Sequence, residues 1–324
     1  MKNNKWAFVK LLTAFLIWGS VGVFRRQIPL SSALLSGLRG ISGGLLLLIY
    51  CLLWQSKGIG NAKSAECSKS TGNAKSTGGT KKFGNPLFYG ITGKQFLAFI
   101  LSGIALGSNW IMLFESYGYT SVAISTVCNN MAPTIIILFS PLLFQEKLNF
   151  RKFICIFVSV LGIFLISGIF QMESFGPSDF IGVGLGLGSA VMYAALIILN
   201  KKNPVENIYG RTIIQLLSAG IFVIPYIVLT EDFQTISLTT FSVIMVVVVC
   251  VLHTSIAYAL YFGSMCHLKA QTVAFMSYLD PTFAIFLSVV LLKEEMNLLT
   301  FLGCVLTIGA AIVSELPEKS KQSS

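Results

Sequence analysis

The stretch PTIIILFSPLLFQEKLNFRKF at Pro133–Phe153 recurs in changed form as PTFAIFLSVVLLKEEMNLLTF at Pro281–Phe301. The two stretches align without a gap at an offset of 148 residues, and eight of 21 positions are identical. The identical pairs are Pro133/Pro281, Thr134/Thr282, Ile137/Ile285, Ser140/Ser288, Leu143/Leu291, Glu146/Glu294, Asn149/Asn297 and Phe153/Phe301. Shared apolar composition would not align a proline, a glutamate and an asparagine at fixed distances. We therefore interpret the chain as a duplicated unit.

The composition is that of a membrane protein. Hydrophobic residues make up 54% of the chain and charged residues 11%, whereas soluble domains carry about 25% charged residues. Ten apolar runs have lengths near the roughly 20 residues that a helix needs to cross the hydrocarbon core. They are Trp6–Phe24, Leu30–Trp54, Gln95–Tyr117, Ser121–Phe144, Phe153–Phe170, Phe180–Leu199, Thr212–Leu229, Phe241–Met265, Thr272–Leu292 and Leu299–Val313. The sequence predicts an all-α integral membrane protein with ten transmembrane helices, embedded in the lipid bilayer.

The duplication divides the ten spans into a first repeat over residues 1–170 and a second over 171–324. Because each repeat holds five spans, an odd number, the second repeat must enter the membrane from the opposite side. The predicted architecture is therefore two inverted five-helix repeats. Residues 56–94 interrupt the first repeat with a low-complexity tract, in which Gly-Asn-Ala-Lys-Ser occurs at Gly60 and again at Gly72. This tract predicts a disordered cytoplasmic loop.

The distribution of the basic residues predicts how the chain is oriented in the membrane. The chain carries a net charge of +10, and 19 of its 23 basic residues fall in segments that are cytoplasmic if the N-terminus is cytoplasmic. This bias predicts a multi-pass protein of the plasma (cytoplasmic) membrane with both termini inside, and no nucleic-acid partner. The first span is expected to be retained rather than cleaved as a signal, because no convincing small-x-small cleavage site precedes Arg25 and Arg26 and nine further spans follow.

Several local motifs accompany this organisation. They are Trp18-Gly19, Leu38-Arg39-Gly40, Tyr258-Ala259-Leu260-Tyr261-Phe262, and the similar proline-to-glutamate ends of the fourth and ninth spans. In these motifs, and in its ten spans, nearly the whole chain resembles the EamA-type transporters of the drug/metabolite transporter superfamily. The resemblance implies transport of amino acids, other small metabolites or drugs, often outward, through a central cavity between the halves. The long second inner loop and Tyr193, where tryptophan is frequent, depart from the family pattern.

Asp280 is the sharpest candidate for a functional residue, because a charged side chain at mid-bilayer costs about 2.5–3.5 kcal/mol on insertion scales. It lies eight residues after Thr272 and twelve before Leu292, near the expected midplane. The next residue, Pro281, has no N–H and so leaves the carbonyl of Ser277 without its helical donor, which predicts a kink. We expect Asp280 to bind a substrate amine or a coupling proton. A buried, protonated side chain that packs helices is the alternative.

The first repeat carries polar groups near the same depth. Pro133 is expected to free the carbonyl of Asn129 and to kink the fourth span. The amides of Asn129 and Asn130 lie beside that carbonyl, and Asn109 lies in the middle of the third span. We expect these amides to line the substrate or proton pathway.

Two further charges lie within apolar spans. Glu115 is near the outer end of the third span, on one helical stripe with Ser108 and Met112. It either reaches the headgroups or lies on the pathway. Arg39 is about nine residues into the second span, where its guanidinium must find an acceptor. It is expected either to pair with an embedded carboxylate or to bind a substrate carboxylate.

One histidine and two aromatic residues complete the candidates. His253 lies within the eighth span, where we expect a neighbouring hydroxyl to satisfy it, with a proton relay as the alternative. Trp18 and Tyr193 occupy matching places in the two repeats. They either line the cavity or pack between helices.

The sequence predicts a secondary active transporter that exports small metabolites, such as amino acids or related zwitterionic or cationic compounds, by alternating access. No hydrolase or zinc-protease motif, metal cluster or nucleotide loop is present, so we expect no enzyme activity, cofactor or metal. The alternatives are a non-transporting scaffold or receptor and a multidrug efflux carrier. The oligomeric state stays open.

Overall fold

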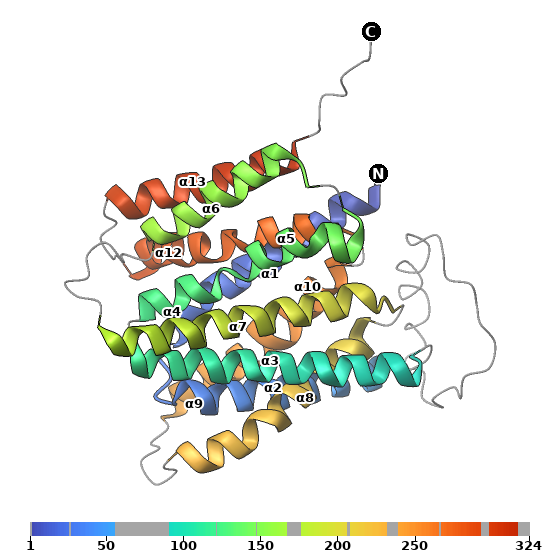
Figure 1. The fold of residues 1–324 in the computed structure, drawn as a ribbon. Coiled ribbons are helices and arrows are strands. Elements are labelled where there is room, and N and C mark those ends of the chain that lie inside the picture. Colours follow the sequence, from blue (N-terminus) through green and yellow to red (C-terminus); the bar gives the residue numbers. More distant parts are fainter. Residues whose placement is uncertain are drawn as a thin grey trace.

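The computed structural model describes residues 2–25, 27–55, 91–120, 122–146, 148–166, 176–205, 208–231, 239–265, 267–292 and 298–316. All regular structure in these ranges is helical (Figure 1). The helices are α1 (Lys2–Arg25), α2 (Ser32–Gln55), α3 (Gly93–Tyr119), α4 (Val122–Asn129), α5 (Ala132–Phe144), α6 (Phe150–Ile166), α7 (Pro177–Lys202), α8 (Ile208–Thr230), α9 (Thr240–Val248), η5 (Val249–Ile256), α10 (Ala257–Met265), α11 (Ala270–Ser277), α12 (Leu279–Leu292) and α13 (Leu298–Glu315). Most of the low-complexity tract, residues 56–90, lies outside the described residues.

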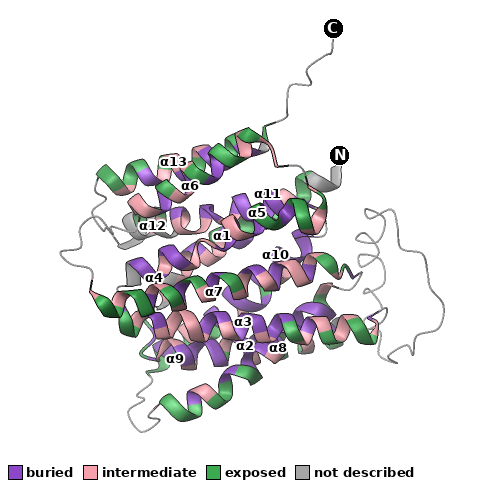
Figure 2. Cartoon of the chain, viewed as in Figure 1, coloured by how far each residue is buried: buried purple, intermediate pink, exposed green. Residues whose placement is uncertain are grey.

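The surface of the bundle suits hydrocarbon rather than water. Buried residues line the contacts between helices, whereas the outward faces are exposed (Figure 2). Many of the exposed side chains are large and apolar, including Leu142 at 84% exposure and Leu229 at 86%. Large apolar patches are rare on soluble monomers and mark surfaces that meet another apolar phase. In the described part of the chain, six helices are long and apolar enough to cross a membrane.

These six spans correspond to α2, α3, the α4–α5 pair, α7, α8 and the run from Thr240 to Met265. The other four predicted spans also fall on helices, which are α1, α6, the α11–α12 pair and α13. The all-helical membrane fold is thus confirmed.

Two of the predicted spans are interrupted near their middle. The fourth is divided into α4 and α5 by a turn at Asn130 and Met131, and the ninth into α11 and α12 by a turn at Tyr278. Pro133 and Pro281 lie in the first turn of the helix that follows each break, where a residue without an N–H is tolerated. The expected kinks are therefore breaks, placed just before the prolines.

Helix boundaries recur at the offset seen in the sequence. Helix α4 begins at Val122 and α11 at Ala270, and α6 begins at Phe150 and α13 at Leu298. Both pairs of starting residues are 148 positions apart. The correspondence does not hold everywhere, because α3 is one continuous helix whereas its counterpart contains the π-helical segment η5 between α9 and α10.

The helices pack in a small set of pairs. The main ones are α3 with α7 and α8, α2 with α8 and η5, α1 with α10 and α12, α4 with α7, α5 with α11, and α6 with α13. Glycines allow two of these crossings. A Cβ atom on Gly40 of α2 would lie 2.7 Å from the Cα of Gly220 in α8. A Cβ atom on Gly162 of α6 would lie 2.8 Å from the carbonyl oxygen of Gly303 in α13. Both helix pairs therefore pack backbone against backbone.

Helix α1 begins and α13 ends at the same end of the bundle (Figure 1). The turn between α5 and α6 and the N-terminus of α11 lie there too. The basic residues Lys152, Lys201 and Lys269 belong to segments at this end. We call it the basic end and the other the distal end.

Candidate functional site

Asp280 lies in the first turn of α12, directly after the break at Tyr278. Its side chain is partly exposed. In the part of the chain that the structure describes, it has no hydrogen-bond or ion-pair partner. The other acidic side chains described there each accept a hydrogen bond: Glu115 from Tyr226, Glu146 from the backbone of Ala270 and Gln271, Asp179 from Thr120, and Glu231 from Ser31. Since carboxylates inside a helix bundle are normally paired, the unpaired Asp280 is the strongest candidate among these residues for contact with a ligand.

Aromatic side chains from α1, α7 and α10 form a cluster near this carboxylate. Tyr193 of α7 and Tyr258 and Tyr261 of α10 all lie within electrostatic range of Asp280. The Tyr193 hydroxyl lies 3.5 Å from that of Tyr261. Trp18 of α1 packs on the same tyrosines, with its ring centroid 4.9 Å from that of Tyr258 and 5.0 Å from that of Tyr261. The structure therefore brings the predicted residues Trp18, Tyr193 and Asp280 together.

Arg39 and His253 lie beside this aromatic cluster, on α2 and η5. The Arg39 Nε donates to the Thr254 hydroxyl at 3.1 Å, and no carboxylate pairs with Arg39 among the described residues. Tyr258 lies within electrostatic range of both Arg39 and Asp280. A cation and an anion thus both lie near one tyrosine, an arrangement that complements a ligand carrying both charges.

His253 is completely buried. Its Nε2 lies 2.9 Å from the Ser20 hydroxyl, and its backbone carbonyl accepts a hydrogen bond of 2.9 Å from the Trp18 indole N–H. A neighbouring hydroxyl therefore meets the ring, as expected of a histidine that holds helices together. The π-helical backbone of η5, a form frequent at functional sites, presents His253 to α1 and Thr254 to α2.

The break in the first repeat has a different polar lining. The Asn109 Nδ2 of α3 donates to the Asn129 Oδ1 and to the Ser189 carbonyl, each at 2.8 Å. The Ser189 hydroxyl of α7 also donates to the Asn129 Oδ1, at 3.0 Å. Asn109 and Asn129 are thus held in one network, whereas Asn130 lies in the turn with a partly exposed side chain. Ser277 of the other break bonds to its own helix through the carbonyl of Ala274.

A hydrogen bond joins the two breaks. The hydroxyl of Thr134, two residues into α5, meets that of Tyr278, which is fully buried at the other break. We predict that Tyr278→Phe, which deletes this hydroxyl and preserves the ring, lowers the free energy of unfolding by about 1 kcal/mol. Thermal unfolding of the purified protein in detergent measures the loss, and Tyr119→Phe on an exposed face serves as the control. Equal melting temperatures for the two variants would contradict the bond.

Glu115 stands apart from the central cluster. It accepts a hydrogen bond from the Tyr226 hydroxyl, and the two residues lie near the C-terminal ends of α3 and α8. The structure thus gives Glu115 a protein partner and does not bring it to Asp280.

Four residues of these two polar regions were not predicted as site residues: Tyr258, Tyr261 and Thr254 near Asp280, and Ser189 beside Asn129. The spacing of Tyr258 and Tyr261 placed both on one helical face, and this was the signal available for them. No comparable pattern marked Thr254 or Ser189.

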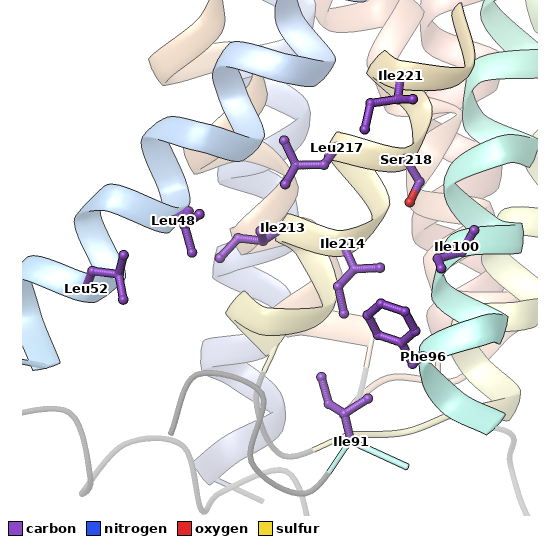
Figure 3. A pocket seen from close by; sticks show the side chains of 10 residues that line it. All are labelled: Leu48, Leu52, Ile91, Phe96, Ile100, Ile213, Ile214, Leu217, Ser218 and Ile221. Atoms are coloured by element: carbon purple, nitrogen blue, oxygen red, sulfur yellow. The ribbon is translucent and has the colours of Figure 1, made fainter. Parts of the chain in front are cut away.

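The bundle also has an apolar groove between α2, α3 and α8, with a volume of about 550 Å³ (Figure 3). Its lining is apolar apart from Ser218, and comprises Leu48, Leu52, Ile91, Phe96, Ile100, Ile213, Ile214, Leu217, Ser218 and Ile221. None of the predicted site residues contributes to it. The groove has no charged group to orient a polar ligand and is separate from the Asp280 cluster. Within the described residues, no group of three or more His, Cys, Asp or Glu side chains is placed to hold a metal ion.

Comparison with known proteins identifies the family. Residues 77–168 and 180–315 match the model of the EamA-like transporter family. The chain is 27% identical over 321 residues to the uncharacterized transporter YxxF of Bacillus subtilis (strain 168), covering 99% of this chain and 93% of that protein. A solved structure titled "Crystal structure of protein" shares the fold, with a TM-score of 0.73 and 17% identity over 95% of this chain and 97% of that chain.

Proposed function

The chain belongs to the EamA-like transporter family, within the drug/metabolite transporter superfamily, and from this premise we propose that it is a secondary active transporter of small zwitterionic or cationic metabolites. The observation that carries the proposal is the unpaired Asp280 carboxylate near Tyr193, Tyr258 and Tyr261. An amine of the cargo would take the place of the missing partner. Export is the proposed direction.

We propose that the ten predicted spans form two inverted repeats, residues 1–170 and 171–324. Helix starts that recur 148 positions apart support this arrangement. The helix pairs support it as well, because most have a counterpart when the repeats are exchanged. The pair α3–α7 corresponds to α1–α10, α3–α8 to α2–η5, α4–α7 to α1–α11, and α5–α7 to α1–α12. The pairs α2–α8 and α6–α13 correspond to themselves, as expected of helices beside a pseudo-twofold axis.

Broken helices support a site at the centre of the membrane. In many secondary transporters, discontinuous helices supply free backbone groups to substrate and ions near the midplane. Here the α4–α5 and α11–α12 breaks are joined by the Thr134–Tyr278 hydrogen bond. Asn109, Asn129 and Asp280 lie at these breaks. The repeats would rock about this point, opening the site to each side in turn, with Asp280 binding either the cargo amine or a coupling proton.

We further propose that the protein is a multi-pass protein of the plasma membrane with the basic end in the cytoplasm. The positive-inside rule supports this orientation. The common placement of the start of α1 and the end of α13 agrees with both termini lying on that side.

Metabolite counterflow in proteoliposomes tests the function. Vesicles holding the purified protein and loaded with one unlabelled metabolite should accumulate the same labelled metabolite, saturably and without ATP. Parallel runs with and without a pH gradient show whether a proton is coupled. A complete lack of flux across amino acids, amines and other small metabolites would favour the alternative of a non-transporting scaffold, and flux of many unrelated drugs would favour a multidrug carrier.

A further inference from the structure

The duplicated glutamate of the sequence acquires a specific contact in the structure. Glu146 follows α5 at the basic end, and its two carboxylate oxygens accept the N–H groups of Ala270 and Gln271 at 2.8 and 3.1 Å. These residues open α11, where the first backbone N–H groups have no partner within the helix. A carboxylate at this position also interacts favourably with the helix dipole. Glu146 therefore caps a helix that lies more than 120 residues further along the chain.

Side chains around this cap extend the contact. The Gln271 Nε2 donates to the Ser140 hydroxyl at 2.6 Å, and both residues are buried. The Lys152 ammonium donates to the Gln271 Oε1. The side chains of Ser140, Glu146 and Lys152, which make these contacts with α11, all belong to the segment around the turn between α5 and α6. One segment of the first predicted repeat thus forms hydrogen bonds with the start of α11 in the second predicted repeat.

The backbone is bent to make this contact. Gln145, immediately before Glu146, has a φ of 55° and lies in the left-handed region. A residue with a side chain adopts this conformation at a cost in energy. Residues held in such conformations cluster at functional and switch regions.

Helix α11, which Glu146 caps, ends next to the proposed binding site. Helix α11 spans eight residues, from Ala270 to Ser277, or about 12 Å at 1.5 Å per residue. It ends at the break that precedes Asp280. Glu146 is itself partly exposed, so water can replace it at the two N–H groups when α11 moves away. The contact between Glu146 and α11 can therefore form and break reversibly.

We propose that Glu146 is the latch of the basic end: while it caps α11, access to Asp280 from that end is closed, and its release opens that access. The inference rests on the proposed alternating access and assigns a role to the glutamate that the duplication singled out. Its duplicate, Glu294, lies outside the described residues. Glu146 acts through α11 and is a positioning residue, since it does not touch the cargo.

Hydrogen–deuterium exchange of the full-length protein in lipid nanodiscs tests the latch without any cargo. In Glu146→Ala, amide exchange in residues 268–276 should rise about two- to thirtyfold, the range that corresponds to loss of a helix cap. Exchange at the distal end, in peptides that contain Thr120 and Asp179, should stay level or fall, because the bundle closes there as the basic end opens. Glu146→Gln, which retains one acceptor oxygen, should give a smaller change of the same sign.

Glu231→Gln is the matched control. It removes a carboxylate that joins the predicted repeats elsewhere, through Ser31, and it should leave exchange in residues 268–276 unchanged. Raised exchange at both ends of the Glu146 variants would show general loosening and overturn the latch, as would no change at α11. Since the exchange experiment uses no substrate, its outcome is independent of the flux measurement. The latch proposal can be refuted while transport is observed in proteoliposomes, and it can be supported while no transport is observed.

Discussion

Replacing Asp280 with asparagine is expected to abolish cargo flux in proteoliposomes while leaving the fold intact. The substitution preserves shape but removes the charge that would pair with the cargo amine. A hydrogen bond to a charged group contributes about 1.5–3 kcal/mol, which corresponds to about ten- to hundredfold weaker binding when it is lost. If Asp280 also binds the coupling proton, flux of Asp280→Asn should no longer respond to a pH gradient. Counterflow measured over a range of pH values checks both effects.

Glu115→Gln is the matched control for this experiment. It neutralises a carboxylate that already has a protein partner, Tyr226, away from the cluster around Asp280. We expect Glu115→Gln to reduce flux far less than Asp280→Asn. Full transport by Asp280→Asn at every pH would refute the assignment of the binding site and leave Asp280 as a helix-packing residue.

Gly220→Leu is expected to prevent correct folding. A Cβ atom at this position would lie 2.6 Å from the Ile41 backbone nitrogen in α2, and backbone atoms cannot move aside as a side chain can. The helices α2 and α8 would have to separate, and overpacking of this kind costs about 1–3 kcal/mol or more. Yield of monodisperse protein in detergent and its melting temperature are the measurements.

Gly184→Ala provides the contrast, because no atom lies within 4 Å of a Cβ built at this position in α7. Alanine is favoured over glycine in a helix interior by about 1 kcal/mol, so this variant should be as stable as the parent or slightly more so. A Gly220→Leu variant that melts at the parental temperature would show that α2 and α8 do not cross as closely as the structure has them.

Most of the helices were predictable, because the hydropathy of a membrane span is a property of local composition. The expected spans fall on helices, and the offset that aligns Pro133 with Pro281 also aligns the start of α4 with that of α11. Proline marked the positions where two helices are interrupted, since its missing N–H is a local effect. The sequence did not show that each interruption is a turn rather than a kink.

The partners of the polar residues could not be predicted from the sequence. Trp18 and His253 are 235 residues apart in the chain and bond directly, and no local pattern encodes such a pairing. Arg39 donates to Thr254 rather than to a carboxylate of the described residues, and its alternative role, binding of a substrate carboxylate, stays a prediction. The π-helical η5 was missed for a related reason, since it differs from an α-helix in which backbone groups bond to each other and not in composition.

The η5 segment also affects the relative free energies of the two open forms that the proposed alternating access requires. Perfectly matched halves would make the two open forms mirror one another and equal in free energy, so an empty carrier would divide its time evenly between the two sides of the membrane. Only one of the two corresponding helices contains a π segment, and this removes the equality. Under the proposed alternating access, the empty protein would therefore favour one of its two open forms when no gradient is present, and cargo on that side of the membrane would reach Asp280 more often.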